Sequence, residues 1–218
     1  MEKENTVFTI RRLFKEDMVL INRYCESFSH MYFNPLTEDY VWHILLQGAF
    51  WAVYQGAVPV AVTYVLPADS PAFASLDAAW HLQDLLDCSG ENTLLCGYVW
   101  TDENCADVDF YSPLVRLWSV QGTRRGRSML VHCMPADKNG DIGPLLYNGF
   151  GLRGLRGLDN LVPHYIFTKQ AELNCRKTEI YHEIKTCPFS DTKTISQLCE
   201  KGYTGFDMDV EKNILFRR

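Results

Sequence analysis

The sequence lacks the features that mark secreted, membrane-spanning or metal-binding proteins. No apolar run approaches the roughly 18 uncharged residues that a membrane span requires. The charged N-terminus, MEKENTVFTIRR, has no apolar signal core. The eight cysteines form no CxxC pair, and no Cys/His cluster has zinc-site spacing. We therefore expect a cytoplasmic protein with reduced thiols, no metal and no membrane association.

Basic charge is also scarce. The 218 residues carry a formal net charge of −6, which argues against a nucleic-acid partner. One short basic run, Arg124-Arg125-Gly126-Arg127, has two interpretations: a solvated turn, or a small anion-binding patch. With 47% hydrophobic and 22% charged residues, the composition is that of an ordinary globular protein with a sizeable core.

The first half of the chain predicts a strand, two helices and three strands. Residues 6–13 alternate as an edge strand does, and apolar residues then recur at helical spacing to about residue 30. Thr37 is a candidate N-cap for a second helix. A hairpin, AFWAVYQ-GA-VPVAVTYVLP, follows. A polar excursion over 67–92, with one short helix (LDAAWHLQDLLD), precedes a third strand over 93–101.

The second half predicts helices alternating with strands. We expect a helix over 110–121, a buried strand over 128–135, a short helix over 141–148 and a strand over 162–169. The glycine-punctuated GLRGLRGLDN separates the last two. Beyond residue 170 we expect a helix over 194–201 and a strand at the end. This order is a mixed α/β layout in one domain.

The segment LLYNGFG, residues 145–151, is typical of a helix end. Asn148 and Gly149 favour a left-handed C-cap, and Phe150 is a core candidate. Tyr147 has two interpretations: a half-buried packing residue with its hydroxyl in water, or a phenol aimed at a ligand. His132, in the apolar run SMLVHCMP, is expected in the core.

This layout, with LLYNGFG between SMLVHCMP and PHYIFTK, resembles the GNAT superfamily of acyl-CoA N-acyltransferases over about residues 6–170. The resemblance implies a mostly antiparallel α/β sheet with splayed fourth and fifth strands and flanking helices. It divides the chain into a GNAT-like domain, residues 1–170, and a C-terminal extension, residues 171–218, packed on the same domain.

The resemblance also implies a function. Acetyl-CoA would be the co-substrate, with its pantetheine between the splayed strands, and a small-molecule or peptide amine the acceptor. Tyr147 would be the acid that protonates the departing thiolate. Asp102 or Glu103 are candidate bases, and a homodimer is compatible with this interpretation. The implied cofactor-binding residues are Val99, Trp100, Thr101, Tyr111, Ser112 and Asn139.

One stretch departs from the GNAT pattern. The family's glycine-containing phosphate loop corresponds here to CADVDFYSP, which has no glycine and contains Asp107 and Asp109. These carboxylates would repel a pyrophosphate, or they simply cap a helix. A second alignment places RRGRSML at the phosphate loop. Two hypotheses follow: an N-acyltransferase, or an inactive GNAT-like fold that acts as a ligand-sensing or protein-binding module.

Overall fold

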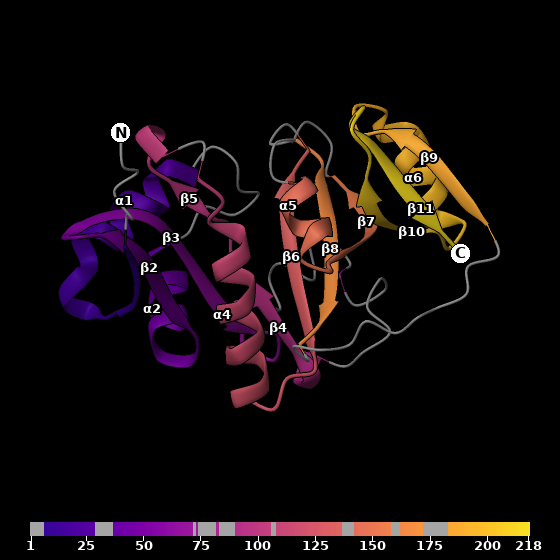
Figure 1. Cartoon of the computed structure of the whole chain (residues 1–218). Coiled ribbons are helices and arrows are strands. Elements are labelled where there is room, and N and C mark those ends of the chain that lie inside the picture. The colour runs from indigo at the N-terminus through magenta and orange to yellow at the C-terminus, as the bar shows by residue number, and fades with distance from the viewer. Residues whose placement is uncertain are drawn as a thin grey trace, which may run out of the picture.

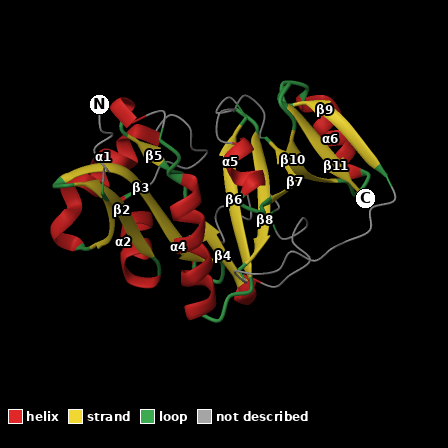
Figure 2. Ribbon diagram, viewed as in Figure 1, coloured by secondary structure: helices red, strands yellow, loops and turns green. Residues whose placement is uncertain are grey.

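The fold is an open, mostly antiparallel sheet with helices on both faces (Figures 1 and 2). The computed structural model describes residues 7–28, 37–71, 73, 82, 90–105, 108–136, 142–157, 162–171 and 183–218. The strands follow the order β1-β2-β3-β4-β6-β8-β7-β10-β11-β9, with β5 paired to β3. No helix in this part of the chain is long and apolar enough to cross a membrane.

The N-terminal elements confirm the prediction. Strand β1 (Phe8–Leu13) leads through the 3-10 turn η1 (Lys15–Asp17) to helix α1 (Met18–Phe28). Helix α2 (Glu38–Gln47) begins at Thr37, whose hydroxyl accepts the Tyr40 N–H at 3.3 Å. Strands β2 (Ala49–Gln55) and β3 (Val58–Pro67) form the expected hairpin, with Gly56 at a φ of +61° in its turn.

The single strand expected over 93–101 is wrong. The chain forms η2 (Gly90–Asn92) and β4 (Thr93–Cys96), leaves the sheet at residues 97–99, and returns as the two-residue β5 (Trp100–Thr101). A 3-10 turn, η3 (Glu103–Cys105), follows. The helix expected within LDAAWHLQDLLD lies outside the described residues.

Between residues 110 and 170, the helices and strands alternate as expected, with one strand missed. Helix α4 (Tyr111–Arg124) is longer than expected. Strand β6 (Met129–Pro135), helix α5 (Ile142–Tyr147) and strand β8 (His164–Gln170) lie where the sequence places them. The glycine-rich segment after α5 is not a loop but strand β7 (Gly151–Arg156), antiparallel to β8 with a register shift between Leu152 and Gly154.

The sheet separates two apolar cores. One face packs against α4, α5 and α6, and its central side chain is the fully buried Trp118. The other face packs against α1 and α2 around Ile21, Ile44 and Tyr64. Alternation along β6 supplies both cores, because Leu130 faces the first and Val131 the second.

The C-terminal segment extends the same sheet. Strand β9 (Ile184–Pro188), helix α6 (Thr192–Glu200) and strands β10 (Thr204–Met208) and β11 (Asn213–Arg217) form a small unit at the end of the sheet opposite β1 (Figure 1). The expected helix and final strand are confirmed, while β9 and β10 were missed. The pairing of β10 with β7 joins Gly205 to Leu152.

We expect Gly205→Ala to weaken the junction between β7 and β10. A Cβ at Gly205 would lie 2.9 Å from Cγ2 of Ile214 and 3.1 Å from Cβ of Leu152. Such overpacking costs about 1–3 kcal/mol of unfolding free energy, measurable by urea titration. Gly143→Ala in α5 is the matched control, because the nearest atom to its new Cβ is Met208 Sδ at 3.9 Å. Equal stability of the two variants would contradict this expectation.

Candidate functional site

Strands β4 and β6 run together and then part. They pair in parallel from Thr93↔Met129 to Cys96↔His132. Beyond that pair β5 bonds to β3, while β6 continues beside β8 as far as Pro135↔His164. The predicted splay of the fourth and fifth strands is therefore present, and it begins at Cys96 and His132.

The bend after Cys96 is fixed by hydrogen bonds from β3 and α1. The Gly97 N–H donates to the Tyr64 carbonyl at 2.7 Å, and the Thr63 hydroxyl donates to the Gly97 carbonyl at 3.0 Å. The hydroxyl of Tyr24 donates to the Tyr98 carbonyl at 3.0 Å. A Cβ at Gly97 would lie 2.3 Å from the Tyr64 ring, so this approach requires glycine.

The side chain at the point of divergence is His132, which is fully buried. Its Nδ1 lies 3.0 Å from the Cys96 carbonyl and must carry the proton, because a carbonyl only accepts. The ring stacks on Trp118 with centroids 5.3 Å apart and meets Tyr98, Tyr111 and Phe150 edge-on. The expected core position is confirmed.

Burial determines the charge of His132. Desolvation lowers the pKa of the imidazole to about 4, although the Cys96 carbonyl opposes the shift by favouring the protonated ring. At neutral pH the ring is therefore neutral, and its Nε2 is a buried acceptor with no hydrogen-bond partner in the part of the chain that the structure describes. The sequence reasoning assigned His132 no functional role, and its only signal was a titratable residue inside an apolar strand.

The predicted cofactor residues lie on two faces of the sheet. Val99 packs against the core beneath α4, where Tyr111 is buried. Trp100 packs on the opposite face, where the Arg23 guanidinium lies 5.4 Å from its ring centroid. Thr101 is half-buried in β5, paired with Ala61. Asn139 lies outside the described residues.

The carboxylate of Asp109, two residues before α4, caps the first turn of that helix. Asp109 accepts the Ser112 N–H at 3.1 Å and the Ser112 hydroxyl at 2.5 Å. The capping interpretation of the acidic segment is thus confirmed for Asp109, while Asp107 lies outside the described residues. The α4 amide that a phosphate would need at this helix end is already bonded to a negative group.

Tyr147 is the last residue of α5 and is 80% exposed, so it is not the half-buried packing residue considered above. The Gly149 N–H donates to Leu146 and the Phe150 N–H to Leu145, and Gly149 has a φ of +85°, which confirms the predicted left-handed cap. Phe150 is buried as expected.

The end of α5 is tied to the start of α4. The Asn148 side-chain amide donates to the Ser112 hydroxyl at 3.0 Å and to the Pro144 carbonyl at 2.8 Å. Ser112 also bonds Asp109, so one short network connects both helix ends. The exposed phenol of Tyr147 stands beside this network in sequence, and its role as an acid stays a prediction.

The two candidate bases lie just after β5. The Asp102 carboxylate accepts the Asn104 N–H and its side-chain amide, each at 2.9 Å. These hydrogen bonds lower the pKa of Asp102, mainly through the backbone N–H, and make it a weaker base. Glu103 is exposed. Within the described residues, no group of three or more His, Cys, Asp or Glu side chains has the arrangement of a metal site.

We expect His132 to make stability depend on pH. Its folded pKa of about 4 lies below the ordinary 6.5, so its contribution is complete above pH 6.5 and is lost as pH falls toward 4. Linkage sets the loss at about 2–3 kcal/mol of unfolding free energy. Urea unfolding at pH 7 and pH 4.5 should show a smaller difference for His132→Phe than for the wild type. An unchanged difference would disprove it.

Comparison with known proteins identifies the fold. No family profile and no curated protein matches the sequence. Among solved structures, yncA from Salmonella typhimurium, solved with acetyl-CoA, has 14% identity and a TM-score of 0.56 and covers 77% of this chain and 96% of its own. NAA60 from Arabidopsis thaliana, also with acetyl-CoA, has 10% identity and a TM-score of 0.55, covering 75% and 98%.

A GNAT-family acetyltransferase from Streptococcus pneumoniae has 9% identity and a TM-score of 0.54, and covers 75% of this chain and 99% of its own. The chain therefore has the fold of GNAT acetyltransferases. These structures are covered almost completely and leave about a quarter of this chain unmatched, a share similar in size to segment 171–218.

Proposed function

We propose that this protein is an acyl-CoA-dependent N-acyltransferase that transfers an acetyl group to an amine. The observation that carries the proposal is the divergence of β4 and β6 after Cys96 and His132 within a GNAT fold. The yncA and NAA60 structures were solved with acetyl-CoA, which supports the same co-substrate here.

The main chain of β6 beyond His132 suits an extended amide-containing arm. Residues 133–135 pair with β8 on one side, while β4 has ended and β5 pairs with β3. An extended group laid along β6 there would bond the strand as an added strand does. Val99 and the buried Tyr111 lie on the same face and would form its apolar wall. A bound thioester would supply the activated acyl group.

The N-terminus of α4 does not fit a pyrophosphate. Asp109 occupies the Ser112 amide and places a negative charge where the family holds two phosphates. We therefore assign no step to this helix end. Tyr147 would act as the proton donor from the end of α5, which the Asn148–Ser112 hydrogen bond holds against α4.

We expect acetyl-CoA to raise the melting temperature of the wild type. A ligand at a hundred times its Kd adds about 2.7 kcal/mol to the stability of the folded state, about 5–10 °C for a chain of this size. Tyr147→Phe should show the same thermal shift but a kcat lowered about 100-fold, the usual contribution of a general acid.

Tyr203→Phe is a control for the loss of a phenol, because Tyr203 lies in the C-terminal unit and bonds Glu183. Its transfer rate should equal that of the wild type. No thermal shift at millimolar acetyl-CoA would disprove the proposed function. A normal shift with unchanged turnover in Tyr147→Phe would exclude only Tyr147 as the acid.

A second candidate function is supported by the Asp109 cap: a GNAT-like fold that binds a ligand or a protein without acyl transfer. In such a protein, the Asp109 carboxylate would not weaken ligand binding, because no phosphate would have to approach it. The two candidates therefore differ in how acetyl-CoA affinity responds to the charge at residue 109.

We expect Asp109→Asn to tighten acetyl-CoA binding about two- to fivefold, the effect of removing one charge near a helix end. Asparagine keeps an oxygen for the Ser112 N–H, so the helix cap survives. Isothermal titration calorimetry measures the change, and Asp102→Asn is the control because Asp102 bonds Asn104 instead. Wild-type and Asp109→Asn proteins that both fail to bind would favour the second candidate.

A further inference from the structure

A basic pocket lies at the other end of the paired strands from the divergence. It has a volume of about 470 Å³ and is lined by Gln47, Pro67, Asp69, Arg125 and Arg127. Residues 91 and 127 come just before the first residue pair of β4 and β6, Thr93↔Met129. The divergence comes after the last pair, Cys96↔His132. The pocket is therefore separate from the proposed acyl-transfer site.

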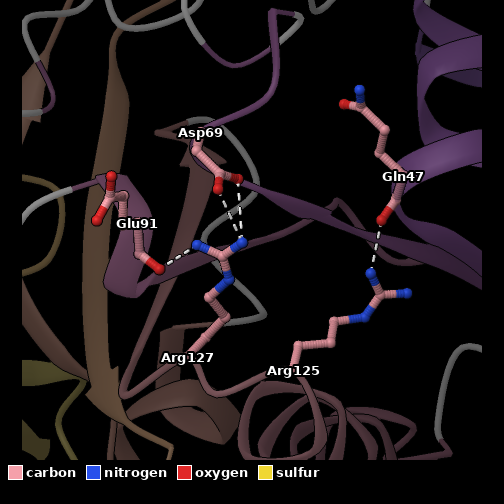
Figure 3. A network of polar contacts seen from close by, with 5 residues as sticks. All are labelled: Gln47, Asp69, Glu91, Arg125 and Arg127. Carbon is pink, nitrogen blue, oxygen red and sulfur yellow. Dashed lines mark hydrogen bonds and ion pairs between the residues drawn. The ribbon is translucent and has the colours of Figure 1, made fainter.

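Arg127 forms one wall and is held through its two terminal nitrogens, while its buried Nε has no hydrogen-bond partner among the described residues. Its guanidinium donates to both carboxylate oxygens of Asp69, at 2.9 and 3.1 Å, and to the main-chain carbonyl of Glu91 (Figure 3). The Arg127 side chain is only 16% exposed, while that of Asp69 is 43% exposed. The ion pair with Arg127 neutralises the Asp69 carboxylate, which is still partly exposed to solvent.

Arg125 reaches the opposite wall, where its partners among the described residues are main-chain carbonyls and not carboxylates. Its guanidinium donates to the carbonyl of Gln47 at 2.5 Å, at the C-terminal end of α2 (Figure 3). It also donates to the carbonyl of Gly48 at 3.0 Å. A guanidinium has five N–H donors, so these two bonds leave three. The helix end offers only partial negative charge, and no carboxylate of the described residues pairs with the full positive charge of Arg125.

A third guanidinium increases the positive charge. Arg12 donates to the same Gly48 carbonyl at 3.4 Å. Burial, followed by repulsion from Arg12 and Arg127, lowers the pKa of Arg125. Within the described residues, Arg125 and Arg127 thus line the pocket with one carboxylate, Asp69, and Arg12 shares the Gly48 carbonyl with Arg125, in a protein whose overall formal charge is −6. The carboxylate of Glu91 points away from Arg127 (Figure 3). An anion is the group that this arrangement lacks.

We propose that this pocket binds a small phosphomonoester, whose phosphate pairs with the unused donors of Arg125 and whose hydroxyl groups donate to Asp69. Arginine presents its N–H groups in a fork that matches phosphate oxygens, and the dianion suits the local excess of positive charge. The volume lies within the range of small-molecule sites, about 300–1,000 Å³, and is larger than a bare phosphate needs. The basic run is thus assigned the anion-binding role.

Isothermal titration with glucose 6-phosphate, glucose and inorganic phosphate at one ionic strength tests the proposal. We expect glucose 6-phosphate to bind more tightly than inorganic phosphate, and glucose not to bind. Arg125→Gln should weaken glucose 6-phosphate binding about tenfold or more, since a charge-assisted hydrogen bond contributes about 1.5–3 kcal/mol. Arg124→Gln is the matched control, because Arg124 is exposed and does not line the pocket.

Arg125→Lys provides a second variant if the glutamine variant fails to fold. Lysine keeps the charge but loses the fork, so we expect weaker binding with near-normal circular dichroism. Absence of glucose 6-phosphate binding by the wild type, or equal binding by the wild type and the folded Arg125 variant, would overturn the proposal. A purely structural Arg125 clamp gives that result, with a lowered melting temperature only. These titrations do not use acetyl-CoA, so their outcome does not depend on whether the protein transfers acyl groups.

Discussion

The hydrogen bond from His132 Nδ1 to the Cys96 carbonyl connects the two strands at the last point where they are paired. Before this point in the sequence, β4 and β6 form a regular parallel ladder. After it, β4 gives way to a bend that is bonded to β3 and α1. Burial against Trp118 keeps the imidazole neutral, and the neutral ring can fill an apolar core without an ionic partner. This side chain thus marks the last pair before the divergence, and the bonds from β3 and α1 fix the bend that follows.

The start of α4 shows how a stabilising contact limits ligand binding. Asp109 satisfies an amide that would otherwise lack an intrahelical partner, and through Ser112 and Asn148 the same network fixes the end of α5. A cap of this kind typically contributes about 1 kcal/mol to helix stability. The chain therefore gains local stability at a helix end whose Ser112 amide is no longer open to an anionic ligand.

Much of the fold follows from side-chain periodicity and capping residues. Thr37, the Gly56 turn and the LLYNGFG helix end were predictable because each depends on neighbouring residues alone. The break at residues 97–99 was not, since it is set by Tyr64 and Thr63 from another strand. Strand β7 was missed because its glycines suggest a loop, although they permit close strand contacts such as that of Gly151 with Thr204.

The candidate site was only partly predictable, because part of it is set by residues that are distant in sequence. The sequence places Tyr111, Ser112 and Tyr147 at the correct helix ends, because their position depends on local helix limits. It does not show that Trp100 faces away from Val99's core, nor that Asp109 bonds Ser112. Those facts depend on the bend and on the packing of α4, which distant residues determine.

The C-terminal unit changes which parts of the molecule can meet a second copy of the chain. Because β10 pairs with β7 through Gly205 and Leu152, the sheet continues past β7 within the protomer, and its outermost strands in the described part of the chain are β1 and β9. An exposed strand edge is the surface through which sheets join between chains. Among the described strands, the two ends of the sheet at which another chain would add a strand are therefore β1 and β9.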